Sequence, residues 1–120
     1  MYRVGQHSYA THQDAPAYKQ INHHCTCLIS VDASTVQNGC LEFASGRHNE
    51  GIIGLTEDGI VSEEAAGPMK FVACETEPGD VVLFSSYVPH RSMKNLSEDQ
   101  VSEKIRSPHL IANPAPSYVL

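Results

Sequence analysis

Turn signals recur at short spacing along this chain, and long stretches with helical periodicity are missing. Asn38-Gly39 and Pro78-Gly79-Asp80 are the clearest turns, because Asn and Gly tolerate positive φ and Pro fixes the preceding corner. Many short strands separated by such turns indicate a mainly all-β fold, a sandwich or a barrel. The sequence predicts strands near residues 7–13, 24–32, 39–43, 51–55, 70–76, 80–86 and 107–112.

The segment 24–32 alternates only partly between apolar and polar side chains, which predicts a central strand buried on both faces. The one helical candidate is residues 62–66, which stops at Gly67-Pro68. A chain of 120 residues with 41% hydrophobic content is long enough for one core. We therefore expect residues 1–120 to form a single domain.

The formal net charge of -6 argues against a nucleic-acid partner, because the eight Lys and Arg residues are scattered and form no basic stripe. The sequence has neither the ~20-residue apolar run that a membrane span needs nor a signal-peptide apolar region at its start. Four cysteines without a C-x-x-C pair predict free thiols in a reducing compartment. We expect a cytoplasmic location.

His12-Gln13-Asp14 is the motif that carries chemistry. Side chains at i and i+2 of a strand point the same way, so His12 and Asp14 can offer two metal ligands on one side. His90, beyond the apolar run at residues 81–84, can offer a third from a different strand. Two imidazoles and one carboxylate on one face of a metal leave positions open, as in non-haem Fe(II) oxygenases. A metal-binding interior in a strand-rich chain fits the double-sheet jelly roll of cupin-like proteins.

Two simpler explanations compete with this interpretation. His12 and Asp14 are also compatible with a solvated strand end, because three-residue motifs recur by chance. His23, His24, Cys25 and Cys27 invite a zinc interpretation, but structural zinc needs four ligands from two separated pairs, and no second pair exists. Core and edge positions of a strand explain these four residues better.

Longer motifs in the same order make the pattern specific. The chain contains the segments HQDAPAY, LISVDASTVQNGCLEFASGRHNEG, EPGDVVLFSSYVPHRSMKNLSE and RSPHLIANPAP. Together they resemble the phytanoyl-CoA dioxygenase family of Fe(II)/2-oxoglutarate oxygenases, and the resemblance covers most of the chain. It implies a double-stranded β-helix, an oxygenase-like jelly-roll domain over residues 1–120, and iron bound by His12, Asp14 and His90.

The resemblance also implies that Ser92 and a later arginine hold the distal carboxylate of 2-oxoglutarate. Ser92 lies at i+2 from His90, so both side chains are expected on one face. Arg106 is the candidate arginine, because a guanidinium suits bidentate carboxylate binding. It comes somewhat later than the family places it, after a segment at residues 98–104 that looks like extra length. Arg91, at i+1 from His90, is expected to point away from the iron.

Family members are usually about twice as long, and they carry helices and a first strand before the H-x-D motif. Here the motif arrives at His12, so we expect a jelly roll that is incomplete at its N-terminus. An uncovered sheet would expose apolar surface and favour self-association, and a site without its lid would catalyse poorly.

The function implied by the resemblance is hydroxylation of a small organic substrate with O2 and 2-oxoglutarate, releasing succinate and CO2. The substrate stays open among acyl-CoA, small organic acids, amino-acid derivatives and phosphonates. One alternative is a non-catalytic jelly-roll fragment or interaction module of the same family. Another is a cupin-type metal enzyme that uses no 2-oxoglutarate.

Overall fold

The computed structural model describes residues 10–21, 23–93, 96 and 109–110. Its elements are two 3-10 turns, η1 (Ala15–Ala17) and η2 (Arg47–Glu50), the short helix α1 (Glu63–Ala66), and six strands: β1 (Cys25–Ile29), β2 (Leu41–Ala44), β3 (Phe71–Cys74), β4 (Val81–Ser85), β5 (His90–Ser92) and β6 (His109–Leu110). The prediction of a mainly β fold is confirmed, as is the short helix, whose N-cap Ser62 accepts a hydrogen bond from the backbone N–H of Ala65.

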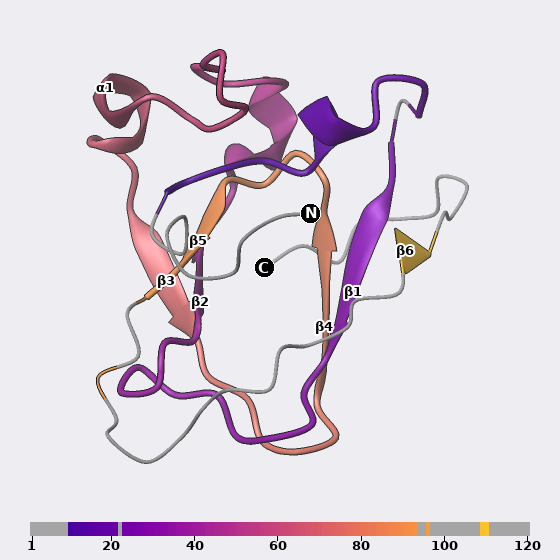
Figure 1. Cartoon of the computed structure of the whole chain (residues 1–120), viewed down its shortest axis with the longest axis vertical. Helices are drawn as coiled ribbons and strands as arrows, with labels where there is room; N and C mark the ends of the chain where they lie inside the picture. Colours follow the sequence, from indigo (N-terminus) through magenta and orange to yellow (C-terminus); the bar gives the residue numbers. More distant parts are fainter. Residues whose placement is uncertain (1–9, 22, 94–95, 97–108, 111–120) are drawn as a thin grey trace.

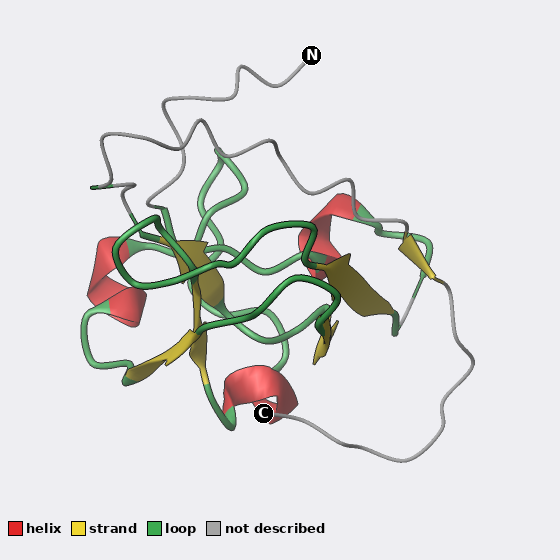
Figure 2. Cartoon of the chain, turned by 90° about the horizontal axis from the view of Figure 1, so that it is seen from below, coloured by secondary structure: helices red, strands yellow, loops and turns green. Residues whose placement is uncertain are grey.

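The strands form two antiparallel three-stranded sheets, in the orders β4-β1-β6 and β3-β2-β5. Figure 1 shows the sheets on opposite sides of the molecule, and the view from below in Figure 2 separates the same two groups of strands. The predicted central position of residues 24–32 is confirmed, because β1 pairs with β4 on one side and β6 on the other. The predicted burial on both faces is wrong, because Cys25 and Ile29 are exposed on the outer face. Gly39 and Gly79 have positive φ in the two predicted turns.

Two strand predictions need correction. Residues 51–55 do not form a strand; they form a loop with Gly51 and Gly54 at positive φ, and the only ladder contact there is the bridge between Leu55 and Val61. Positive φ interrupts the extended backbone that a strand requires. In the predicted strand 7–13, the described residues make a single bridge, at His12.

Apolar side chains pack between the sheets and also behind one of them. The inner cluster contains Phe43, Val82, Phe84 and Val88, and Leu28, Leu41 and Cys74 pack against it. Alternation along β2 places Ala44 on the opposite face from Phe43. There Ala44 packs with Val61 and Met69 beneath the residues of α1. The sheet β3-β2-β5 is therefore buried on both faces at this point.

The outer face of β4 and β1 is different. Ile29, Val81 and Leu83 share that face and are 44%, 54% and 55% exposed. Ile29 lies directly opposite Val81 in the ladder, so the three side chains form one apolar patch, called here the outer β4–β1 patch. Among the described residues, no helix is long and apolar enough to cross a membrane.

Candidate metal centre

The backbones of His12 and His90 are paired directly. The N–H of His12 donates to the carbonyl of His90 at 2.9 Å, and the N–H of His90 donates to the carbonyl of His12 at 2.9 Å. Residues that exchange both hydrogen bonds in an antiparallel bridge stand opposite each other with side chains on the same face. The two imidazole rings therefore lie side by side, with centroids 4.2 Å apart.

Asp14 reaches the same place from a bend rather than from a strand, which corrects the predicted strand geometry. It has αR backbone angles and is the N-cap of η1, a turn with Pro near its start. Proline suits the first helical positions because its φ is fixed and its missing N–H would be unpaired there anyway. The chain thus curls immediately after His12, and the Asp14 side chain still turns toward the imidazoles.

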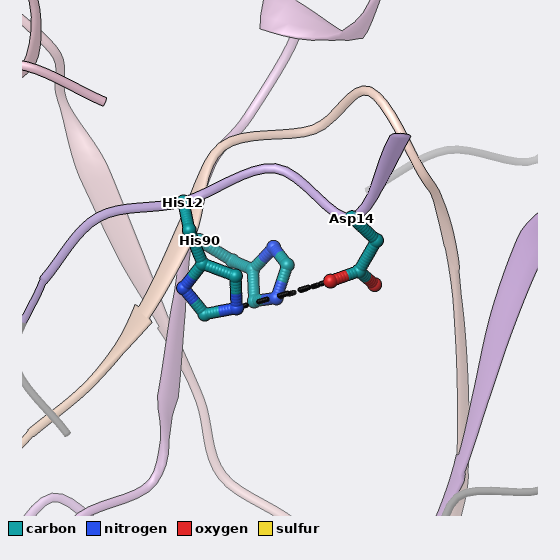
Figure 3. A group of neighbouring side chains, drawn as sticks. All are labelled: His12, Asp14 and His90. Carbon is teal, nitrogen blue, oxygen red and sulfur yellow. Dashed lines mark ion pairs between the residues drawn. The ribbon is translucent and has the colours of Figure 1, made fainter. Parts of the chain in front are cut away.

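Figure 3 shows the side chains of His12, Asp14 and His90 converging. Oδ1 of Asp14 lies 3.8 Å from Nε2 of His12 and 3.6 Å from Nε2 of His90. One donor atom from each residue lies within 4.8 Å of the other two. Atoms this close can all reach one ion at about 2.0–2.2 Å after small side-chain adjustments. Two imidazoles with one carboxylate are a donor set that suits Fe(II).

Backbone carbonyls fix which nitrogen of each ring faces Asp14. Nδ1 of His12 lies 3.2 Å from the carbonyl of Ala10, and Nδ1 of His90 lies 3.0 Å from the carbonyl of Val88. A carbonyl can only accept, so each Nδ1 carries the proton and donates it, and each Nε2 of a neutral ring keeps a free lone pair. Metal-binding histidines are commonly oriented in this way.

The ring of His90 is enclosed by the inner cluster. Its centroid lies 4.9 Å from that of Phe84 and 5.9 Å from that of Phe43. Burial lowers the pKa of the His90 imidazole and the nearby His12 lowers it further, while Asp14 and the Val88 carbonyl act in the opposite direction. His90 is therefore neutral at neutral pH, which leaves its Nε2 lone pair available.

Exposure differs across the three residues. The side chain of His90 is 5% exposed, that of Asp14 is 17% exposed and that of His12 is 42% exposed. The group is thus closed on the side of His90 and open to solvent on the side of His12. A small molecule would approach from the His12 side.

Thr26 on β1 also belongs to the site, although no sequence motif singles it out. Its hydroxyl donates to Oδ2 of Asp14 at 2.6 Å, and the residue is buried. Oδ2 is thereby occupied, and Oδ1 is the oxygen that faces the two Nε2 atoms. The sequence indicates only that Thr26 is a polar residue within a strand predicted to be central and buried.

Gln13, between the two motif residues, ties its own segment to two loops. Its Nε2 donates to the carbonyls of Gly51 at 2.8 Å and Tyr87 at 2.6 Å, and its Oε1 accepts from the N–H of Ile53 at 2.9 Å. Tyr87 lies in the loop that leads from β4 to His90. The buried amide therefore holds the segment of His12 and Asp14 against the segment that carries His90.

The candidate residues for 2-oxoglutarate are placed only in part. Ser92 shares β5 with His90 and lies at the same parity, so both face the interior. Arg91 lies on the opposite face, as expected: its Nε donates to Glu42 at 2.7 Å and its guanidinium stacks 3.9 Å over the ring of Phe71. Arg106 falls outside the described residues.

The rival zinc group does not assemble. Within the described part of the chain, His12, Asp14 and His90 are the group of three potential ligands that come close enough to share an ion. Cys25 and Cys27 are free cysteines on β1, the first exposed and the second buried. The ring of His23 lies against that of Tyr87, with centroids 5.3 Å apart.

The two sheets and the three converging ligands define a double-sheet jelly roll with a candidate metal centre in its interior. The chain belongs to the phytanoyl-CoA dioxygenase (PhyH) family, whose model matches residues 2–102. The expected cupin-like fold is confirmed by crystal structures of EvdO2 from Micromonospora carbonacea var. aurantiaca. One has a TM-score of 0.64 at 24% identity and covers 76% of this chain and 40% of that chain. Another, complexed with 2-oxoglutarate, has a TM-score of 0.60 at 21% identity and covers 90% and 49%.

Curated relatives are more similar in sequence. A protein of Gimesia maris named methylphosphonate hydroxylase is 45% identical over 91 residues, 76% of this chain and 35% of the relative. A 2-aminoethylphosphonate dioxygenase from uncultured bacterium HF130_AEPn_1 is 44% identical over 96 residues, 78% of this chain and 37% of the relative. The chain thus spans little more than a third of the length of these relatives.

The role of Gln13 leads to a prediction about stability. Gln13→Glu keeps the size of the side chain but turns a carboxylate oxygen toward the carbonyls of Gly51 and Tyr87. We expect the free energy of unfolding to fall by about 1–3 kcal/mol, because two buried acceptors lose their donor. Urea denaturation followed by circular dichroism measures it. Gln37→Glu, the same change at an exposed position, should alter stability by less than about 0.5 kcal/mol. Equal effects at the two positions would contradict the role of the Gln13 amide in holding the two loops.

Proposed function

We propose that this chain carries the iron centre of an Fe(II)- and 2-oxoglutarate-dependent dioxygenase. The observation that carries the proposal is the convergence of His12, Asp14 and His90 in the interior of a chain that belongs to the phytanoyl-CoA dioxygenase family. The donor set and the two free Nε2 lone pairs support Fe(II) as the ion. The whole reaction is a proposal, since the chain spans about 35–37% of its curated relatives.

Each residue has a distinct task in this proposal. His12, Asp14 and His90 hold the metal on one face, while Phe43 and Phe84 keep water away from the side of His90. Bound iron supplies the oxygen-activating redox chemistry that no side chain of the chain can provide. In the overall reaction, 2-oxoglutarate, O2 and a substrate C–H bond give succinate, CO2 and a C–OH group. One oxygen atom enters succinate and the other enters the product.

Ser92 and Arg106 are the proposed contacts of the distal carboxylate of 2-oxoglutarate. The position of Ser92 on the same strand face as His90 supports its part. Support for Arg106 is partly by exclusion: the guanidinium of Arg91 is engaged by Glu42 and Phe71 on the opposite face of the sheet.

A small phosphonate is the proposed substrate. Its support is the 44–45% identity to two proteins that are named for methylphosphonate and 2-aminoethylphosphonate. Such molecules are small enough to approach from the solvent side of His12, whose side chain is 42% exposed.

Residues 1–120 are proposed to act as one jelly-roll domain that associates with itself through the outer β4–β1 patch. Three large apolar side chains side by side on an exposed sheet face favour association. The four free cysteines support a reducing, cytoplasmic location.

The iron assignment predicts which histidines matter. Fe(II) binding, measured anaerobically by calorimetry, should be lost in His12→Ala, Asp14→Ala and His90→Ala, because each change removes one of three ligands. His23→Ala should bind Fe(II) like the unaltered chain, since His23 lies outside the group. Retained binding in His12→Ala together with loss in His23→Ala would move the site elsewhere.

The co-substrate assignment predicts a difference between two arginines. Arg106→Lys should weaken 2-oxoglutarate binding to the iron-loaded chain about 10-fold or more, because a bidentate charge-assisted pair contributes about 1.5–3 kcal/mol. Arg91→Lys should change it little. Titration gives the 2-oxoglutarate affinities of the variants. A separate assay of succinate formation with methylphosphonate, 2-aminoethylphosphonate and an acyl-CoA shows which substrate supports turnover. An iron-loaded chain that binds no 2-oxoglutarate would favour the cupin-type alternative, and a chain that binds neither would favour the interaction module.

Self-association has its own measurement. Light scattering coupled to size-exclusion chromatography should give a mass above that of one 13.1 kDa chain. The double change Val81→Thr and Leu83→Thr keeps β propensity but removes apolar surface, so it should shift the mass toward the monomer. Val31→Thr, at a 72% exposed position outside β1, is the matched control. A monomeric unaltered chain would refute the association.

A further inference from the structure

The carboxylate of Asp14 is held by a residue from another element. Asp14 lies in the bend before η1, and its backbone is part of neither sheet. Thr26 lies on β1, which is paired on both sides, and the Thr26 hydroxyl donates to Oδ2 of Asp14 at 2.6 Å. Thr26 is 4% exposed, so this hydrogen bond forms away from solvent. The central strand of one sheet therefore holds a ligand whose own backbone lies outside both sheets.

We propose that Thr26 is a positioning residue that makes Asp14 a one-oxygen ligand. This inference rests on the proposed function, because it concerns the same iron centre. A free carboxylate can bind a metal through one oxygen or through both. The Thr26 hydroxyl occupies Oδ2 and leaves Oδ1 toward Nε2 of His12 and Nε2 of His90. A second carboxylate oxygen on the iron would take a position that 2-oxoglutarate or O2 needs.

The side chain is suited to this task. Threonine is β-branched and stiff at χ1, so a strand holds its hydroxyl in one direction. A buried hydroxyl needs a hydrogen-bond partner, and Asp14 is the acceptor that the structure provides for it. The inward parity of β1 sets this direction, because Thr26 and Leu28 share the face that looks toward the other sheet.

The test compares two buried threonines in the full chain. Thr26→Val removes the hydroxyl without changing the shape of the side chain, and Thr26→Ser restores a hydroxyl. Thr76→Val is the matched control: Thr76 is also buried, and its hydroxyl hydrogen-bonds to that of Ser30 at 2.6 Å. Ser30 lies four residues along the chain from Thr26, about 13 Å away in an extended chain at 3.3 Å per strand residue. The control therefore removes a buried hydrogen bond at a distance from Asp14.

Co(II), as an oxygen-stable stand-in for Fe(II), provides the readout. Thr26→Val should bind Co(II) about 10–100-fold more weakly than the unaltered chain, as expected when the partner of a metal ligand is lost. Its visible absorption spectrum should also change, because that spectrum reports the number and geometry of the ligands. Thr26→Ser should stay within about 3-fold of the unaltered chain, well below the roughly 10–100-fold loss expected when the partner is removed. Thr76→Val should lower the melting temperature without altering Co(II) affinity or the spectrum.

The outcomes separate this inference from the proposed function. If the unaltered chain binds Co(II) and Thr26→Val binds it equally well with the same spectrum, the positioning role is wrong while the metal centre stands. If the unaltered chain binds no metal, both fail. Thr26→Ala serves as a second variant should Thr26→Val not fold. Failure of both to fold, or an equal loss of affinity in Thr76→Val, would make Thr26 a purely structural residue.

Discussion

The reciprocal pair of backbone hydrogen bonds between His12 and His90 is the constraint on which this site depends. It joins two segments that are 78 positions apart in the chain, and it places both imidazoles on one face through main-chain atoms. Gln13 reinforces the pair from the other side, because its amide binds the loops on both flanks. The geometry of the two rings is thus set by the backbone, and only Asp14 needs a side-chain partner.

The chemistry of the site follows from what surrounds these three residues. Backbone carbonyls take the Nδ1 protons, burial keeps His90 neutral, and Thr26 takes one carboxylate oxygen. Each effect removes an alternative state: a second tautomer, an imidazolium or a two-oxygen ligand. What remains is one donor atom from each residue, and the three atoms lie within 4.8 Å of one another, close enough to share a metal ion.

The outer faces of the two sheets differ in what covers them. Behind β3-β2-β5 a second apolar cluster packs beneath α1, and Arg91 uses that side for its contacts with Glu42 and Phe71. The outer β4–β1 patch carries exposed valine and leucine instead. One sheet is therefore covered on both faces, while the other leaves apolar side chains exposed on its outer face.

The sequence by itself determined the fold class, the turns at Gly39 and Gly79, and the identity of the metal-binding candidates, because turn chemistry and donor type are properties of single residues and short motifs. It misjudged residues 51–55 and the backbone at Asp14, where glycines at positive φ and a proline-led 3-10 turn override a strand pattern. Only the tertiary structure decided that Thr26 holds Asp14, that Gln13 clamps two loops and that the rings present Nε2. The contacts of Thr26 and Gln13 join different elements, so they depend on how those elements pack. The carbonyls that orient the rings lie only two residues away, but the backbone geometry that brings them there is set by the pairing of His12 with His90. No local pattern encodes either arrangement.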